Sequence, residues 1–360
     1  MSGAADSVSG GRRPPVIRSG ELSAPKDHIL TQDDLVIAAV VPCHNEAHTV
    51  AKVVTDLRAT VPGIQVYVYD NNSSDGTDEL ARAAGAVVRY ENRKGKGNVV
   101  RRAFSDIDAD VYLLIDGDDT YDVDDAPAMI ETLLEGPYDH VLGVRRELDP
   151  SSSAYRPGHE AGNKAFNRLV SGLFGLPVTD MLSGYRIFSR RFVKSFPALS
   201  REFEIETELT VHSMNLRVPQ TEVEVGFRDR PEGSESKLST VKDGVKILTL
   251  IAHLIRHERP LAFHGIVGAV FALVGLLLAV PIFVEFGETG LVPRFPTAFL
   301  AASLMILAFL TWLVGLVLDG ITRSRRESSR LVYLGYGAPG RRTPNGHLPP
   351  EGSDPEIARG

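Results

Sequence analysis

Two uncharged apolar segments near the end of the chain restrict its folding more than any other feature of the sequence. Residues 265–284 and 295–318 contain no Asp, Glu, Lys or Arg. Each is long enough to cross about 30 Å of hydrocarbon as a helix, and longer than uncharged stretches in most soluble helices. The short link between them, EFGETGLVPR, predicts that they form a transmembrane helical hairpin.

The basic residues that flank the two segments predict how the hairpin is oriented. RHERP precedes the first segment, and RSRRESSR follows the second. Lys and Arg are enriched on the cytoplasmic side of membrane proteins, so both ends of the hairpin are expected there. We therefore expect a two-span protein of the inner (plasma) membrane, with the preceding domain and both termini in the cytoplasm.

The chain divides into a large domain, this hairpin and several connecting segments. The ends are rich in Gly, Ser and Pro, which is typical of disorder. Residues 241–260 place apolar side chains at helical spacing beside lysines, as in an interfacial amphipathic helix. The predicted regions are a disordered arm at 1–34, an α/β domain at 35–240, a juxtamembrane helix at 241–260, two transmembrane helices at 261–320, and a cytoplasmic, mostly disordered tail at 321–360.

Composition and missing motifs argue against several classes of protein. The net charge of −7 argues against a nucleic-acid partner, because a basic field normally supplies that affinity. The single cysteine, Cys43, rules out an internal disulfide framework. No G-x-G-x-x-G follows the first predicted strand, and RKGKGN lacks the features of a P-loop. A dinucleotide-dependent dehydrogenase and a P-loop kinase are both disfavoured.

Strand-like and helix-like segments alternate through the first part of the large domain. Apolar runs rich in β-branched and aromatic residues predict strands at 35–41, 64–70, 87–92, 110–116 and 140–144. Helical periodicity lies between them, and this alternation is typical of an α/β domain with a mostly parallel sheet. Ligands bind such sheets beyond the carboxyl ends of the strands, where PCHNE, DNNSSDGT and DGDDTYD occur.

The acidic segment DGDDTYD is a candidate metal site. Asp116 and Asp118 lie two residues apart at a strand end, so their side chains can converge. Hard carboxylate oxygens suit Mg²⁺ or Mn²⁺, and such an ion would share its remaining positions with substrate phosphates. The alternative is a solvated acidic turn, since short acidic motifs have many chance matches.

Four motifs, in order, resemble the family 2 glycosyltransferases of GT-A fold: VVPCHNE, VYDNNSSDGT, RKGKGNVVRRAF and DGDDTY. The resemblance runs over residues 36–238. TDMLSGYRIFSRR, FEIETELTVHS and RPEGSESKL, followed by two spans, resemble the polyprenyl-phosphate (dolichyl-phosphate mannose synthase-like) enzymes. The Q-x-x-R-W motif of the processive synthases is missing.

This resemblance implies an inverting, metal-dependent hexosyltransferase. The donor would be a UDP- or GDP-linked sugar, with UDP favoured by analogy, and the acceptor a polyprenyl phosphate of undecaprenyl or dolichyl type. The cofactor would be Mg²⁺ or Mn²⁺. Neither the sugar nor the state of homo-oligomerisation follows from the sequence. The rival interpretations are a transferase for another membrane lipid and a catalytically inactive membrane scaffold.

The resemblance also assigns residues to the donor side. Asn71 stands where the family usually has a second aspartate. Thr120 stands where a glutamine often joins the metal site, and its hydroxyl is a weaker ligand. The expected metal ligands are Asp116, Asp118 and Thr120. The expected nucleotide-binding residues are Pro42, Asn45, Glu46, Asp70, Asn71, Lys96 and Asp116.

On the acceptor side, cationic and amide side chains are expected around the lipid phosphate. The candidates are Arg145, Asn163, Lys164, Asn167 and Arg186, and the expected catalytic residues are Asp116, Asp118, Glu206, Arg230 and Lys237. If REFEIETEL were a strand, Glu204 and Glu206 would share a face; in a helix, Glu204 and Glu208 would do so. Because a phosphate monoester is already largely ionised, no strong base is required, and the role of Glu206 stays open.

Overall fold

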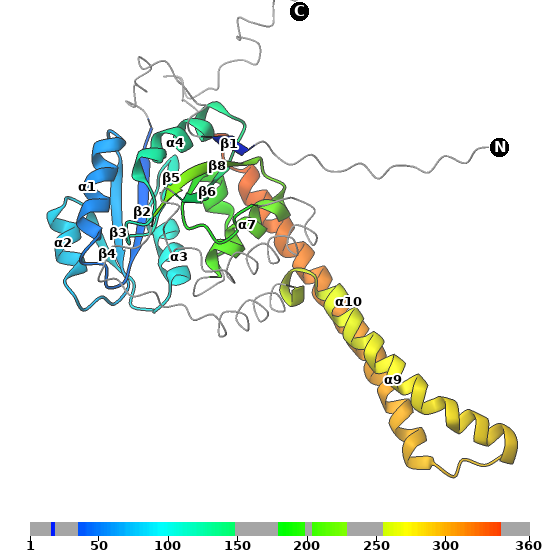
Figure 1. Cartoon of the computed structure of the whole chain (residues 1–360). Helices are drawn as coiled ribbons and strands as arrows, with labels where there is room; N and C mark the ends of the chain where they lie inside the picture. The colour runs from blue at the N-terminus through cyan, green and yellow to red at the C-terminus, as the bar shows by residue number, and fades with distance from the viewer. Residues whose placement is uncertain (1–15, 19–34, 148–178, 199–203, 229–254, 340–360) are drawn as a thin grey trace, which may run out of the picture. The chain divides into compact units, whose positions relative to one another are not determined.

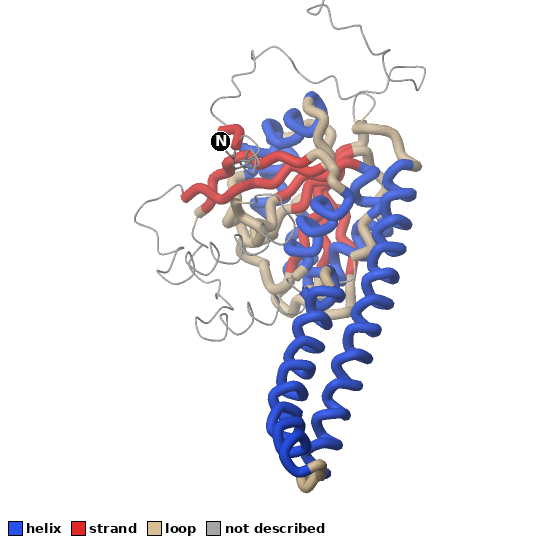
Figure 2. The backbone as a smooth tube through the Cα atoms, turned by 90° about the vertical axis from the view of Figure 1, so that its right-hand side faces the viewer, coloured by secondary structure: helices blue, strands red, loops and turns tan. Residues whose placement is uncertain are grey.

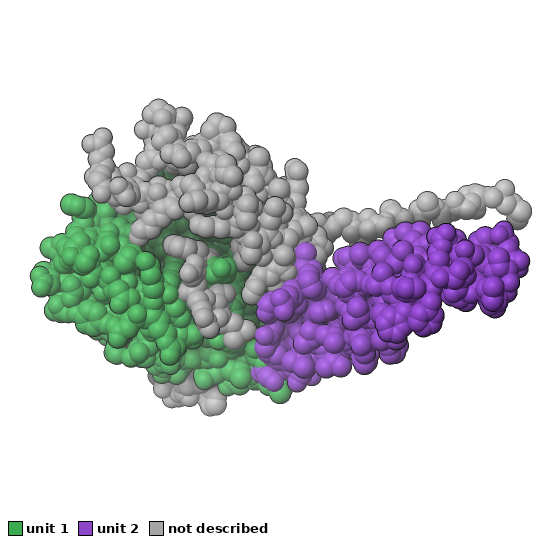
Figure 3. Space-filling model, turned by 90° about the horizontal axis from the view of Figure 1, so that it is seen from below, with its two compact units in different colours: residues 1–237, 329–360 green, residues 238–328 purple. Residues whose placement is uncertain are grey.

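The computed structural model describes residues 16–18, 35–147, 179–198, 204–228 and 255–339. The chain forms two compact units (Figure 3). One consists of Met1–Lys237 and Ser329–Gly360, and the other of Leu238–Ser328. We refer to them as the catalytic unit and the hairpin unit.

A single mixed sheet organises the catalytic unit (Figure 1). Strand β7 is antiparallel to its neighbours β5 and β6, and the remaining pairs are parallel. The mostly parallel α/β fold expected from the sequence is therefore confirmed. In sheet order the strands are β1 (Val16–Arg18), β8 (Gln220–Phe227), β6 (His140–Glu147), β7 (Arg186–Ser189), β5 (Val111–Leu114), β2 (Ile37–Cys43), β3 (Gln65–Asp70) and β4 (Val87–Tyr90).

Helices cover both faces of this sheet. The first face packs against α1 (Val50–Thr60), α2 (Thr77–Ala83) and α4 (Ala126–Glu135), the last of which follows the short 3-10 turn η1 (Val123–Asp125). The second face packs against α3 (Lys96–Asp106), α6 (Arg190–Ser195) and α7 (Ile205–Leu216).

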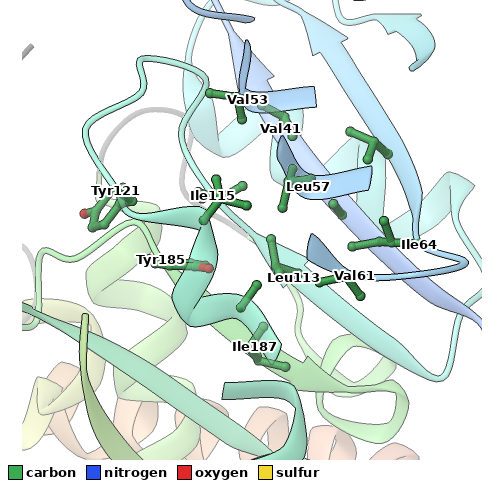
Figure 4. Packing of buried hydrophobic residues seen from close by; sticks show 14 of the residues in the cluster. Val41, Val53, Leu57, Val61, Ile64, Leu113, Ile115, Tyr121, Tyr185 and Ile187 are labelled. Atoms are coloured by element: carbon green, nitrogen blue, oxygen red, sulfur yellow. The ribbon is translucent and has the colours of Figure 1, made fainter. Parts of the chain in front are cut away.

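Strand β2 is buried on both sides because successive side chains of a strand point to opposite faces. Its odd-numbered residues, such as Val41, pack with α1, whereas Ala38 and Val40 pack with the α3 layer. Figure 4 shows Val41, Leu57 of α1 and Leu113 of β5 in the first core. A continuous apolar run is the sequence signature of such a strand.

Strand β7 was not predicted. RIFS is only four residues long, and it enters the sheet antiparallel between β5 and β6. A short apolar run carries no periodicity of its own, and its place depends on partners elsewhere in the chain.

Two described segments lie within the expected tails. Val16–Arg18 within the arm at 1–34 forms β1 and pairs with β8, because an edge strand offers unpaired backbone groups. The helix that contains the second apolar segment continues to Leu334, well into the tail expected at 321–360. Gly335 follows directly, and glycine is a common helix terminator. The juxtamembrane helix expected at 241–260 lies outside the described residues up to 254.

The hairpin unit contains α9 (Pro260–Thr289) and most of α10 (Phe295–Leu334), which run antiparallel (Figure 2). Both are long and apolar enough to cross a membrane. Large apolar side chains such as Phe283 and Phe299 are 70% and 68% exposed. A buried helix of a soluble core would cover such residues.

Small residues form the seam between α9 and α10. Gly268 and Gly275 of α9 face α10, and a Cβ on Gly268 would meet the side chain of Trp312. The Trp312 indole N–H donates to the Gly265 carbonyl at 3.1 Å. The buried residues of α10 in this unit recur at seven-residue intervals: Ala301, Ala308, Gly315 and Thr322. Small residues let helix backbones approach closely, which is how helices associate in lipid.

The last turn of α10 belongs to the catalytic unit. The Tyr333 hydroxyl donates to Oδ2 of Asp139 at 2.6 Å, and the Arg191 guanidinium lies over the Tyr333 ring at 4.7 Å. Asp139 is fully buried and also accepts hydrogen bonds from Ser189 and Arg191. A buried carboxylate with several donors is well satisfied, so this cluster holds the end of α10 against the sheet domain.

Candidate active site

Carboxylates from neighbouring strand ends gather around the end of β2. Cys43, the last residue of β2, is buried, and burial raises the pKa of its thiol well above the usual value. The negative charges of Glu46, Asp70, Asp116 and Asp118 raise that pKa further. Because β5, β2 and β3 are adjacent and parallel, their carboxyl ends meet at one edge, as the sequence predicted.

An ion triad lies at this edge. The ammonium of Lys96, the first residue of α3, is 2.5 Å from Oδ1 of Asp116 and 2.7 Å from Oε1 of Glu206. The Lys96 and Glu206 side chains are 8% and 6% exposed. Burial lowers the pKa of Lys96, but the two carboxylates raise it more strongly, so the lysine is charged. These three residues come from the start of α3, the acidic segment DGDDTYD and α7.

Glu206 lies in a helix, α7, which decides between the two interpretations of REFEIETEL. Glu206 is buried toward Lys96, whereas Glu204 precedes the helix and is exposed. Within the described residues, Oε2 of Glu206 is buried without a hydrogen-bond partner. A buried carboxylate oxygen without a donor is energetically unfavourable, so it is a candidate contact for a bound group.

The loops that follow β2 and β3 are joined by hydrogen bonds. The Asn45 backbone N–H donates to the Ser73 hydroxyl at 3.0 Å, and Oδ1 of Asn45 accepts from the Ser74 backbone N–H at 2.9 Å. Oδ2 of Asp70 accepts from the Ser73 backbone N–H at 3.1 Å. Oδ1 of Asp70 is buried, and no described residue donates to it. Asp70 therefore keeps one carboxylate oxygen without a donor among the described residues, whereas Asn45 holds the two loops together.

Asn71 holds the loop between β4 and α3. Its side-chain N–H groups donate to the carbonyls of Glu91 and Arg93 at 2.6 and 2.8 Å, and its side-chain oxygen accepts from the Gly95 N–H at 2.7 Å. An aspartate has no N–H group and could not make the first two bonds. The family usually has an aspartate at the position of Asn71. The amide accounts for this difference, because its hydrogen bonds position the loop that leads into Lys96.

Within the acidic segment DGDDTYD, a neighbouring hydroxyl holds the side chain of Asp118. The Thr120 hydroxyl donates to Oδ1 of Asp118 at 2.7 Å, so Thr120 orients Asp118. A Cβ on Gly117 would meet the sulfur of Cys43, which explains the glycine between the aspartates. The described residues contain no group of three or more His, Cys, Asp or Glu suited to a metal ion. An ion held by Asp116 and Asp118 would need substrate oxygens as well, which is the usual arrangement for Mg²⁺.

The two described arginines of the expected acceptor group lie in different surroundings. Arg145 on β6 makes a two-bond contact with Asp180, with Nε and Nη2 both at 2.7 Å from its oxygens, and lies over the Phe227 ring at 5.3 Å. Arg186 is fully buried and donates to the Ser183 and Met181 carbonyls and the Thr210 hydroxyl.

Burial lowers the pKa of Arg186 to about 10, while Glu206 and Asp180 raise it. Its hydrogen bonds make Arg186 a core residue that ties β7 to α7, rather than one presented to a ligand. The other expected acceptor and catalytic residues lie outside the described residues: Asn163, Lys164, Asn167, Arg230 and Lys237.

Two residues of the site were missed. A Cβ on Gly184 would meet both Asp116 and the Lys96 ammonium, so only glycine fits beside the triad. Its N–H donates to the Tyr121 hydroxyl at 2.8 Å. Asp180, the partner of Arg145, was not singled out either. Both lie in TDMLSGYR, whose polar and glycine residues were the available signal, but their partners are distant in sequence.

A solved structure shares this fold. Glucosyl-3-phosphoglycerate synthase from Mycobacterium tuberculosis, in complex with Mn²⁺, uridine-diphosphate-glucose and phosphoglyceric acid, has a TM-score of 0.53 and 20% sequence identity to the chain. The match covers 67% of this chain and 87% of that chain. At this identity the likeness shows the GT-A fold.

Sequence relatives extend the comparison. An uncharacterized protein of Shigella flexneri is 53% identical over 43% of this chain and 94% of its own length. In Haloferax volcanii, glycosyltransferase AglJ is 37% identical over 68% of this chain and 80% of its own length. A dolichyl-phosphate hexose transferase of the same organism is 30% identical over 64% of this chain and 97% of its own length. The sequence model "Glycosyl transferase family 2" matches residues 38–196. The chain belongs to glycosyltransferase family 2.

Proposed function

We propose that this glycosyltransferase moves a sugar from a nucleoside-diphosphate sugar to a polyprenyl phosphate at the cytoplasmic face of the membrane, inverting the anomeric centre. The observation that carries the proposal is the ion triad of Lys96, Asp116 and Glu206 at the carboxyl edge of the sheet, beside Asp70 and Asp118. Both charge signs at the carboxyl edge of the sheet support a site for a diphosphate and its counter-ion.

The donor half is supported by groups with unused hydrogen-bonding capacity. Asp70 presents a buried oxygen that can accept from an N–H or O–H group of a nucleoside. Lys96, at the start of α3, can donate to a phosphate oxygen. We favour UDP over GDP, because the synthase of the same fold has UDP-glucose as its ligand.

The residues fit a divalent ion that is shared with the donor. Asp116 and Asp118 would hold Mg²⁺ or Mn²⁺, and Thr120 would keep Asp118 in position. Two carboxylates leave room for phosphate oxygens in the ligand set. When bound, the ion neutralises the charge that develops on the leaving diphosphate.

Transfer would be a single displacement. An oxygen of the lipid phosphate forms a bond to the anomeric carbon as the bond from that carbon to the diphosphate oxygen breaks. The nucleoside diphosphate leaves with the bonding electrons, and the anomeric configuration inverts. Arg145, held by Asp180 through Nε and Nη2, is our proposed contact for the acceptor phosphate, because a charged guanidinium makes strong charge-assisted contacts with phosphate.

The hairpin supports a lipid acceptor. Its exposed apolar helices α9 and α10 would anchor the catalytic unit at the bilayer, and flanking basic residues favour both ends in the cytoplasm. The relative named dolichyl-phosphate hexose transferase, of which the match covers 97%, supports a phosphorylated isoprenoid. An inactive scaffold is disfavoured by the assembled triad and by Asp118.

A second candidate is transfer to a lipid hydroxyl. Glu206 favours it, because a carboxylate with a buried, unpartnered oxygen beside Asp116 is suited to accept a proton from an alcohol. A phosphate acceptor needs no such base.

The test is incubation of the purified full-length chain with UDP- and GDP-sugars, Mg²⁺ or Mn²⁺, and either polyprenyl phosphate or polyprenol, followed by mass spectrometry of the lipid. We expect a hexose on polyprenyl phosphate only. A hexose on polyprenol would establish the second candidate. If the chain bound no nucleoside diphosphate in the presence of metal, the inactive membrane scaffold would be the remaining interpretation.

A further inference from the structure

We propose that Lys96 is a built-in counter-cation that competes with the divalent ion for Asp116, so that the metal binds tightly only together with the nucleoside diphosphate. The inference rests on the proposed function, because it assumes that Asp116 and Asp118 hold the ion. It concerns a different property, namely the order and interdependence of metal and nucleotide binding.

The geometry sets the two cations in competition. Oδ1 of Asp116 is 2.5 Å from the Lys96 ammonium, a strong charge-assisted contact. The same ammonium lies 2.7 Å from Oε1 of Glu206. A divalent ion that uses Asp116 must approach a carboxylate already neutralised by a buried positive charge, and like charges repel strongly in a partly desolvated site.

Lys96 is held in this position by its surroundings. The Gly95 N–H, next to it in the chain, is fixed by Asn71 at 2.7 Å, and Gly95 itself has a φ of 121°, a value that favours glycine. On the other side, the missing side chain of Gly184 leaves the space that the ammonium and Asp116 occupy. Lys96 is therefore a packed element of the site rather than a mobile surface lysine.

The nucleotide resolves the competition. A diphosphate brings negative oxygens that can accept hydrogen bonds from Lys96 and ligate the metal at the same time. Once Lys96 contacts phosphate, the Asp116 carboxylate is available to the ion. Glu206, whose other oxygen has no partner among the described residues, keeps the ammonium within reach of the site.

The experiment is a Mn²⁺ titration of the full-length chain in detergent, with free Mn²⁺ measured by electron paramagnetic resonance. It is run without nucleotide, with UDP and with GDP. The variants are Lys96→Gln, which removes the charge, and Lys96→Arg, which keeps it. Lys94→Gln is the matched control, because Lys94 is an exposed lysine just before α3 and makes no ion pair within the described part of the chain. Thermal unfolding of each variant checks folding.

For the wild type we expect weak Mn²⁺ binding alone and at least about tenfold tighter binding with the favoured nucleotide, as a coupling between two ligands of one site. Lys96→Gln should bind Mn²⁺ alone at least about tenfold more tightly than the wild type, because one repelling charge is gone. Its gain on adding nucleotide should shrink accordingly. Lys96→Arg and Lys94→Gln should resemble the wild type.

Three results would count against the inference. Unchanged nucleotide-free Mn²⁺ affinity in folded Lys96→Gln would overturn it while leaving the proposed donor site intact. An equal rise in Lys94→Gln would reduce the effect to net charge, and would overturn it too. If neither wild type nor variant took up Mn²⁺ with any nucleotide, the metal-dependent donor site itself would be refuted, and the inference with it. A misfolded Lys96→Gln is replaced by Lys96→Met in the same titration, with the same criteria.

Discussion

The catalytic unit and the hairpin unit bury opposite kinds of side chain. The sheet of the catalytic unit buries large residues such as Leu113 and Phe188 completely. The hairpin unit buries Gly268 and Ala308, while Phe283 is 70% exposed. Hydrophobic burial in water drives the first arrangement. The second is the pattern expected if the hairpin lies in lipid, as we propose, because close backbone packing is the driving force available to helices there.

The difference extends to charge. The catalytic unit buries Lys96, Arg186 and Asp139, each with polar partners, because an isolated buried charge is strongly unfavourable. The hairpin segments 265–284 and 295–318 have no charged residue to pair. Substitutions should therefore act by electrostatics and hydrogen bonding in one unit and by steric fit in the other.

The largest expected effect is in the catalytic unit. Asp118→Asn should lower kcat about a hundredfold or more, because it removes a charge from the metal ligands, and a catalytic metal supplies several kcal/mol of transition-state stabilisation. Thermal unfolding should change little. The matched control is Asp124→Asn, an exposed acid of the same segment, which should keep near-normal kcat. Equal activity of the two variants at saturating Mn²⁺ would contradict the metal assignment.

Arg145→Ala should destabilise the catalytic unit by about 3 kcal/mol, because it leaves the buried Asp180 carboxylate without its two-bond partner. It should also raise the KM for lipid phosphate without changing nucleotide affinity. The double variant Arg145→Ala/Asp180→Ala separates the two roles. We expect it to regain part of the stability, measured by denaturant unfolding, while the lipid KM stays high. A normal KM in the double variant would leave Arg145 with a structural role only.

Asn71→Asp should destabilise the catalytic unit by about 2–3 kcal/mol, because two buried donors are lost and a carboxylate faces two carbonyls. UDP affinity should fall as Lys96 loses its fixed position, and isothermal titration measures it. Asn72→Asp is the control: Asn72 is exposed and donates only one described hydrogen bond, to Asn92. The role of Asn71 as a loop support would be wrong if both variants bound UDP as the wild type does.

In the hairpin unit, Gly268→Leu should weaken the association of α9 and α10 by about 1–3 kcal/mol, because the new side chain collides with Trp312 and the Ala308 backbone. Val270→Leu, at an outward-facing position that is 53% exposed, should have no such effect. Cross-linking of cysteine pairs placed across the seam reports the association in membranes. Similar cross-linking of both variants would contradict the claim that steric fit at the seam governs the hairpin unit.

The smallest effect concerns the last turn of α10. Tyr333→Phe should lower the free energy of unfolding of the catalytic unit by about 1 kcal/mol, because Asp139 loses one of several donors. Tyr336→Phe should change it by a few tenths at most, since the Tyr336 ring contacts Arg190 without a described hydrogen bond from its hydroxyl. Denaturant unfolding measures both variants. Equal free energies of unfolding would show that the Tyr333 hydroxyl does not stabilise the catalytic unit.

The strands of the donor half were predictable because their signal is local. Continuous apolar runs match β2 and β5, and the polar motifs that follow them reach the same sheet edge because the strands are parallel. Asn45, Asn71 and Arg186 were harder. Each was expected to contact a ligand, but their side chains hold loops or a buried strand, and a motif does not specify what a side chain contacts.

The sequence by itself determined the family, the alternation of strands and helices, the placement of acidic motifs at strand ends and the two long apolar helices, since all of these depend on neighbouring residues. Only the tertiary structure decided that β7 enters the sheet antiparallel, that Lys96 meets Glu206, and that Arg186 is buried while Arg145 pairs with Asp180. These outcomes depend on desolvation and on partners far apart in the chain, and no local pattern of residues encodes either.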